Sequence, residues 1–204
     1  MVCSDEQYSN DTTISMKILV AGDSFAAEWP GHNGWTKLLA NSHTVTNVAQ
    51  AGCSEYKILK QIQKVKLDEF DCVIVSHTSP SRVHTPCHPL HKQGLHKDCD
   101  LLWNDIDRTN LFNPSLAAAK GYFRYHYDDQ YQCDMYALVR QQINTLLTNK
   151  QYISMSHIEV AKLFVVEDQH IDFSEFWQEH KGKENHYNTK GNQKLHQILL
   201  DNIK

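Results

Sequence analysis

Three short apolar runs, separated by segments with helical spacing, constrain this chain more than any other feature of its sequence. The runs Lys17–Ala21, Thr44–Val48 and Cys72–Val75 each have the length and composition of a buried strand. Apolar strands that alternate with helices form a parallel sheet covered on both faces. We therefore predict an α/β protein, a three-layer α/β/α sandwich built on a parallel sheet.

The rest of the chain extends this pattern. Apolar periodicity predicts helices over Gly34–Ala40, from the N-cap Ser54 onward, over Tyr131–Leu147 and over Asn188–Ile203. Two further strands are predicted over Tyr152–Met155 and Lys162–Val166. On the third of these helices the apolar face includes Met135, Leu138 and Leu146.

The 204 residues fit one domain with a long insertion. Residues 1–15 are polar and aperiodic, and we expect a flexible leader there. Residues 16–204 form the single domain. Within it, residues 77–127 are rich in His, Pro and aromatic side chains and show no sustained period. A stretch of that length in a compact domain is functional or contains short elements that periodicity does not reveal.

Composition excludes several classes of protein. Hydrophobic residues make up 41% and charged residues 22%, which excludes a disordered, collagen-like or coiled-coil chain. The net charge of -4 argues against nucleic-acid binding, and no apolar run is long enough to cross a membrane. Six cysteines without a secretory signal predict reduced thiols and a cytoplasmic location. The sequence does not indicate an oligomeric state.

A serine directly follows the first predicted strand, in Gly22-Asp23-Ser24. Ligands of open parallel sheets bind outside the carboxyl ends of the strands. Ser24 is exposed there, and backbone N–H groups beside it can stabilise an oxyanion. The alternative is that Ser24 only caps a helix.

A serine nucleophile needs a base, and the base needs an orienting partner. His186 stands just before the last predicted helix, with Glu184 two residues earlier. A histidine at that junction can reach the same crevice as Ser24. The alternative is that His186 and Glu184 are an ordinary solvated pair on the protein surface.

Together these blocks resemble the SGNH (GDSL-type) hydrolase family. Residues 21–25 (AGDSF) are similar to its first block, residues 47–52 (NVAQAG) to its second, and residues 186–191 (HYNTKG) to its last. The resemblance implies a flavodoxin-like sheet, a nucleophilic Ser24, a general base in His186, and an oxyanion hole that includes the backbone N–H groups of Ser24 and Gly52. It also implies an esterase or acyltransferase that needs no cofactor, with acetyl esters of glycans a frequent substrate class.

Two departures from the family pattern affect the expected site. The family's third block supplies an oxyanion-hole Asn, whereas here Pro80, which has no N–H, holds the matching position. We expect Ser79 to donate instead, with Thr78 and Ser81 as alternatives. Family members commonly carry Asp three residues before the His, a position that Lys183 holds here. Glu184 is the nearest substitute. Asp23 is expected to bond the backbone of its own turn.

Arg82 and His77 follow the third strand and are expected to bind substrate. A guanidinium at the crevice can grip a carboxylate or phosphate, although a surface salt bridge is the alternative role for Arg82. His77 is also a possible oxyanion donor.

Potential metal ligands are concentrated in the insertion. Two His-x-x-Cys units, His84/Cys87 and His96/Cys99, suit a tetrahedral structural zinc site. The alternative is a metal-free, histidine-rich lid. Nearby aromatic residues either stack on sugar rings or form a satellite core under the loop.

The leading hypothesis is a serine esterase or acyltransferase acting on a small-molecule or glycan ester. A catalytically impaired module that keeps the fold and binds glycans, or has a structural role, is the second. A flavodoxin-like nucleotide binder is disfavoured, because neither a Gly-x-Gly-x-x-Gly nor a Gly-Lys-Ser/Thr phosphate loop is present.

Overall fold

The computed structural model describes residues 15–108, 113–164, 170–182 and 186–203. Its centre is one five-stranded parallel sheet in the order β2-β1-β3-β4-β5. The strands are β1 (Lys17–Gly22), β2 (Thr44–Asn47), β3 (Cys72–His77), β4 (Gln151–Ser156) and β5 (His170–Asp172). This is a doubly wound order, and its direction reverses between β1 and β3, where such sheets bind ligands.

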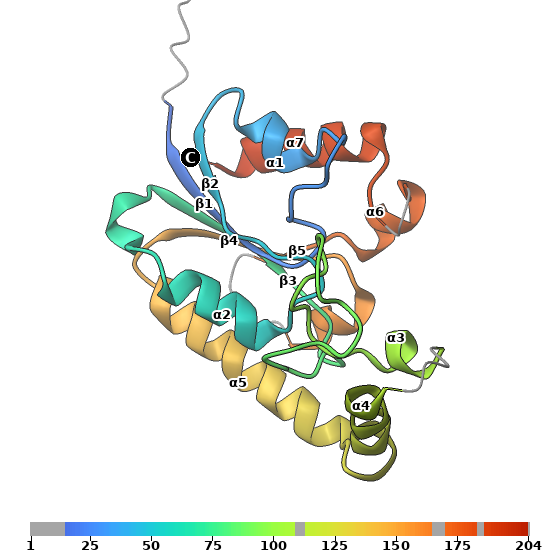
Figure 1. The fold of residues 1–204 in the computed structure, drawn as a ribbon. Coiled ribbons are helices and arrows are strands. Elements are labelled where there is room, and N and C mark those ends of the chain that lie inside the picture. Colours follow the sequence, from blue (N-terminus) through green and yellow to red (C-terminus); the bar gives the residue numbers. More distant parts are fainter. Residues whose placement is uncertain (1–14, 109–112, 165–169, 183–185, 204) are drawn as a thin grey trace, which may run out of the picture.

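Helices cover both faces of the sheet (Figure 1). Side chains alternate along β1, so Ile18 and Val20 pack on one face and Leu19 and Ala21 on the other. The first face carries α1 (Trp35–Leu39) and α7 (Thr189–Asn202), and the second carries α2 (Glu55–Gln63) and α5 (Asp129–Leu147). The predicted α/β class with a parallel sheet is confirmed.

One predicted strand is wrong. Residues 159–164 form the 3-10 segment η2 (Glu159–Phe164), and residues 165–166 of the prediction lie outside the described part of the chain. The fifth strand is β5 instead. The two ring nitrogens of its His170 form hydrogen bonds with serines of β4: Nδ1 lies 2.8 Å from Ser154 Oγ, and Nε2 lies 2.9 Å from Ser156 Oγ. Polar side-chain pairs therefore join β5 to β4, which an apolar pattern cannot predict.

The insertion contains two short helices, α3 (Trp103–Asp107) and α4 (Pro114–Tyr125). They enclose a small apolar cluster of their own, in which Ile106 and Leu116 are buried. Phe123 packs against this cluster, so part of the aromatic content serves a satellite core. The remaining short elements are η1 (Leu67–Glu69) and α6 (Ser174–Glu179).

Among the described residues, no helix combines the length and apolar character that a membrane span requires. The five cysteines in the described part of the chain carry free thiols.

Candidate functional site

The turn that carries Ser24 is built by Asp23. The Asp23 carboxylate accepts the Phe25 N–H at 3.0 Å, and its carbonyl accepts the Ala27 N–H at 3.0 Å. No helix begins here, since α1 starts at Trp35 with Gly34 as its N-cap, so the interpretation of Ser24 as a helix cap is wrong. Asp23 bonds its own turn as predicted. Ser24 is left half-buried at the carboxyl edge of the sheet.

His186 lines the same pocket as Ser24, although 162 residues separate them in the sequence. Trp29 lies between them: its indole N–H donates to the Ser24 carbonyl at 2.9 Å, and its ring centre is 4.3 Å from that of His186. Phe25 contacts His186 from a second direction, with ring centres 5.3 Å apart. The two residues predicted to react with each other therefore share one aromatic-walled pocket.

This pocket is small. Its cavity volume is about 80 Å³, which is room for only a few water molecules. The rim adds Glu28, His32 and Lys37. An acyl group of a few heavy atoms fits such a space.

Glu184, the predicted orienting acid, lies outside the described residues. The support that the structure does give to this loop comes from Tyr187. Its hydroxyl lies 2.6 Å from Nδ1 of the buried His157, and the His157 ring stacks on Phe25 at 4.4 Å. Burial has the largest influence on the pKa of His157 and lowers it to about 3, so this ring is neutral near pH 7.

Sequence analysis did not single out His157. The available signal was its position, directly after the strand that ends at Ser156. The carboxyl ends of parallel strands lie at one edge of the sheet, so a polar residue directly after a strand is a candidate site residue for the same reason as Ser24.

Gly52, the other residue predicted for the oxyanion hole, is not among the residues that line the Ser24 pocket. Its φ of +71° is a left-handed conformation that favours glycine, and its carbonyl accepts the Asp100 N–H at 2.8 Å. A Cβ added to Gly52 would lie 2.9 Å from Cys99 Cβ. The segment 84–101 is thus packed directly on the residue predicted to complete the oxyanion hole.

We predict that Gly52→Ala destabilises the protein by about 2 kcal/mol, half from the left-handed backbone and half from the contact with Cys99. Gly31→Ala is the matched control, because Gly31 has a similar φ of +75° but nothing within 4 Å of its added Cβ. It should cost about 1 kcal/mol. Urea midpoints of both variants measure the difference, and equal losses would contradict the close packing of Cys99 on Gly52.

Arg82 does not line the Ser24 pocket. Its Nη1 donates to the Gly52 carbonyl at 3.3 Å, and it lies instead in two neighbouring hollows. Its Nε is buried and has no hydrogen-bond partner among the described residues. The Arg82 guanidinium therefore contacts Gly52 and is not among the groups that line the Ser24 pocket.

The structure places His77 and Ser79 apart from the pocket as well. His77 is fully buried, with Nδ1 2.5 Å from Glu55 Oε1 and Nε2 3.0 Å from the Tyr152 hydroxyl. Ser79 lines a separate hollow, and its Oγ accepts the Ser81 N–H at 3.2 Å. The ring of His77 therefore has no surface on which to bind a substrate.

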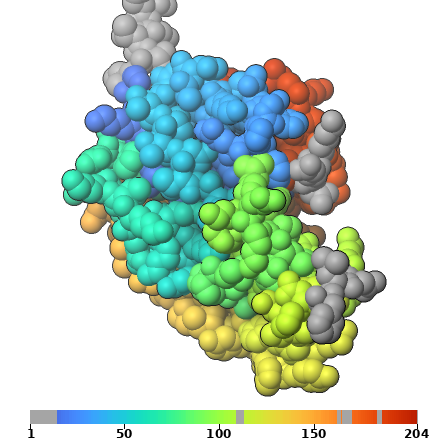
Figure 2. All heavy atoms as spheres, viewed as in Figure 1, coloured from blue at the N-terminus to red at the C-terminus, as the bar shows by residue number. Residues whose placement is uncertain are grey.

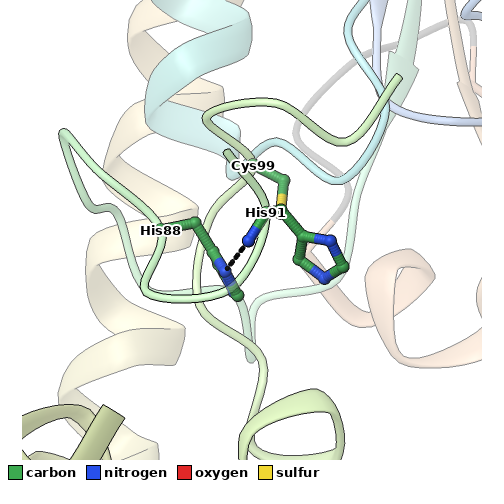
Figure 3. A group of neighbouring side chains, drawn as sticks. All are labelled: His88, His91 and Cys99. Atoms are coloured by element: carbon green, nitrogen blue, oxygen red, sulfur yellow. Dashed lines mark hydrogen bonds between the residues drawn. The ribbon is translucent and has the colours of Figure 1, made fainter. Parts of the chain in front are cut away.

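The predicted zinc ligands His84, Cys87, His96 and Cys99 are not gathered into one group. His84 lies 3.2 Å from the Asp100 carboxylate, and Cys87 is exposed beside Lys92. Cys99 is instead grouped with His88 and His91 (Figure 3). His96 lies between His91 and Trp29, with ring centres 5.4 and 5.7 Å away.

Comparison with known proteins adds no family assignment. No family model matches the chain, and no curated protein does either. Any functional conclusion therefore rests on the site itself.

Proposed function

We propose that the protein is a serine-dependent ester hydrolase or acyltransferase of the SGNH type, acting on small acyl esters. Ser24 is the nucleophile and His186 the general base. The observation that carries the proposal is that these two residues, from opposite ends of the sequence, line one small pocket. The strand order and the position of Ser24 directly after β1 support it.

In the proposed reaction His186 takes the Ser24 proton as Oγ attacks the ester carbonyl carbon. The carbonyl π bond opens, and its oxygen becomes the oxyanion held by the N–H groups of Ser24 and Gly52. The imidazolium then gives its proton to the leaving alkoxide as the C–O bond breaks. Water, or a sugar hydroxyl in the case of transfer, releases the acyl group by the reverse sequence. Glu184 is proposed to orient the imidazole, a role that rests on the sequence alone.

The pocket favours a short acyl group such as acetyl, because its volume is about 80 Å³. Its wall includes Trp29, which offers an aromatic surface to a sugar ring that carries the acetyl group. We therefore propose O-acetylated carbohydrates as the substrate class.

A fluorophosphonate probe tests the nucleophile without knowledge of the substrate. We expect one covalent adduct, assigned to Ser24 by peptide mass spectrometry. The adduct should disappear in Ser24→Ala and persist in Ser42→Ala, because Ser42 lies in the turn before β2, at the opposite edge of the sheet. Absence of an adduct on Ser24 in the wild-type protein would contradict the proposal.

One observation favours a second candidate, a glycan-binding module without catalysis. Trp103, Phe123 and Tyr127 line a hollow together with Arg82, and Ser24 takes no part in it. Stacking of sugar rings on these aromatic residues is chemically suited to glycan binding. Glycan binding that is lost in Trp103→Ala, without any probe adduct on Ser24, would support this alternative.

A further inference from the structure

A group of three potential metal ligands lies in the segment 84–101, outside the Ser24 pocket. One ligand atom from each of His88, His91 and Cys99 lies within 4.8 Å of the others. Figure 3 shows the three side chains brought together by the folding of this segment on itself. His88 and Cys99 are buried, with 0% and 2% of their surface exposed, and His91 is half-buried.

The donor chemistry fits zinc. Two imidazoles and one thiolate are borderline-soft ligands, and three protein ligands plus a water complete a tetrahedron. Zn–N distances of about 2.0 Å and Zn–S distances of about 2.3 Å require ligand atoms roughly 3.3–3.7 Å apart. Since the ligand atoms lie at most 4.8 Å apart, their separations have to contract by no more than about 1.5 Å, which is a side-chain adjustment rather than a change of fold.

His88 supplies an independent sign of a missing partner. Its Nδ1 accepts the N–H groups of Leu90 and His91, each at 3.1 Å, so the neutral ring carries its proton on Nε2. That Nε2 is buried and has no hydrogen-bond partner among the described residues. A buried N–H without a partner is costly. The other tautomer of the ring carries its proton on Nδ1 and offers the Nε2 lone pair to a cation, so a bound ion at Nε2 would remove this cost.

We propose that His88, His91 and Cys99 bind one Zn²⁺ ion. Cys99 releases its thiol proton to solvent as the Zn–S bond forms, and the two neutral imidazoles release none. Coordination through His88 Nδ1 displaces its two backbone N–H donors directly. Coordination through Nε2 displaces them too, because the ring proton then moves to Nδ1. In both cases the Leu90 and His91 amides lose their present acceptor.

The bound ion would connect this segment to the proposed catalytic edge. Cys99 lies against Gly52, and the next residue, Asp100, donates its N–H to the Gly52 carbonyl. The same segment reaches Trp29 through His96, and Figure 2 shows it in green against the blue residues that follow β1. Zinc would therefore fix the segment that packs on Gly52 and on Trp29, and Trp29 lines the Ser24 pocket. Zinc binding itself does not depend on the proposed esterase activity.

The test uses the full chain, purified without an affinity tag under reducing conditions. We expect close to one zinc per chain by elemental analysis. After chelation and titration with cobalt(II) chloride, a thiolate-to-cobalt charge-transfer band should appear. Nuclear magnetic resonance of the zinc-loaded protein should show large shifts of the Leu90 and His91 amide signals.

Matched variants separate this site from the one predicted by the spacing of His-x-x-Cys. Cys99→Ser and His91→Asn should weaken cobalt binding at least about 100-fold, whereas Cys87→Ser and His84→Asn should bind as the wild type does. His91→Asn keeps the test valid if the buried Cys99→Ser fails to fold, because His91 is half-exposed. Absence of a charge-transfer band in the wild type, or an equal loss in Cys87→Ser and His84→Asn, would overturn the proposal.

Discussion

Ser24→Ala and His186→Asn are each expected to reduce the kcat for hydrolysis of p-nitrophenyl acetate by about 10⁴-fold or more. In the proposed mechanism, the first substitution removes the attacking oxygen, and the second removes the group that takes its proton. Ser42→Ala is the matched control. It makes the same chemical change in the turn before β2, where Ser42 Oγ donates to the Leu39 carbonyl. Its kcat should stay within about twofold of the wild type, as is usual for a surface substitution away from a site.

The double variant is the sharper measurement. When two residues act as one unit, removing both costs about as much as removing either. We therefore expect the Ser24→Ala/His186→Asn protein to be no slower than Ser24→Ala alone. A double loss equal to the product of the single losses would mean that the two residues act independently. In that case Ser24 and His186 share a pocket without acting as a nucleophile and its general base.

The strands and the main helices could be predicted because burial on both faces leaves continuous apolar runs in the sequence. β1, β2, β3 and β4 lie where those runs indicated. The fifth strand could not be found in this way. β5 has three residues, and the hydrogen bonds of His170 with two β4 serines help to hold it, so it carries no apolar signature.

The face of α5 shows a second limit of apolar periodicity. Met135, Leu138 and Leu146 were predicted to lie on its apolar face, but they are 39%, 58% and 40% exposed. The buried stripe includes the apolar Ile143 and Leu147 and, together with them, Tyr136 and Arg140. Their polar ends donate to the Thr78 and Ala161 carbonyls, which compensates for the burial of these groups.

That Ser24 and His186 line one pocket was predictable, because chain topology brings the carboxyl ends of the strands and the loop before the last helix to one edge. The arrangement within the insertion was not. Residues 78–102 contain no regular helix or strand, so nothing periodic reports which histidine meets which cysteine. The His-x-x-Cys spacing predicted that each cysteine would share a metal site with the histidine three residues before it. In the structure, the turn at residues 88–91 instead brings His88 and His91 close to Cys99.

Asp23→Asn is expected to stabilise the protein at neutral pH. Asp23 is 1% exposed, and burial, as the largest influence, raises the pKa of its carboxyl from 3.8 to about 6. Between these two values the folded chain holds a proton that the unfolded chain has lost. The contribution of Asp23 to the free energy of unfolding therefore falls as the pH rises from about 4 to above 6, and stays lower from there on. At about 1.4 kcal/mol per pH unit, the decrease is on the order of 3 kcal/mol.

An asparagine keeps the shape of this turn without the buried charge. Its Oδ1 can still accept the Phe25 N–H and the Ser76 hydroxyl, which at present both donate to the same carboxylate oxygen, at 3.0 and 3.4 Å. We therefore expect Asp23→Asn to exceed the wild type by up to about 3 kcal/mol at pH 7 and to match it near pH 4. Urea unfolding at a series of pH values measures both limits.

The chain has a net charge of -4, so the loss of any one carboxylate also reduces general repulsion. Asp201→Asn, on the exposed surface of α7, controls for that effect and should change the unfolding free energy by less than about 0.5 kcal/mol at every pH. If Asp23→Asn retains the pH dependence of the wild type, Asp23 is not the group responsible. If the dependence disappears, the chain tolerates a buried carboxylate one residue before Ser24 at a real cost in stability. Such a cost is typical of residues retained for the chemistry of a site.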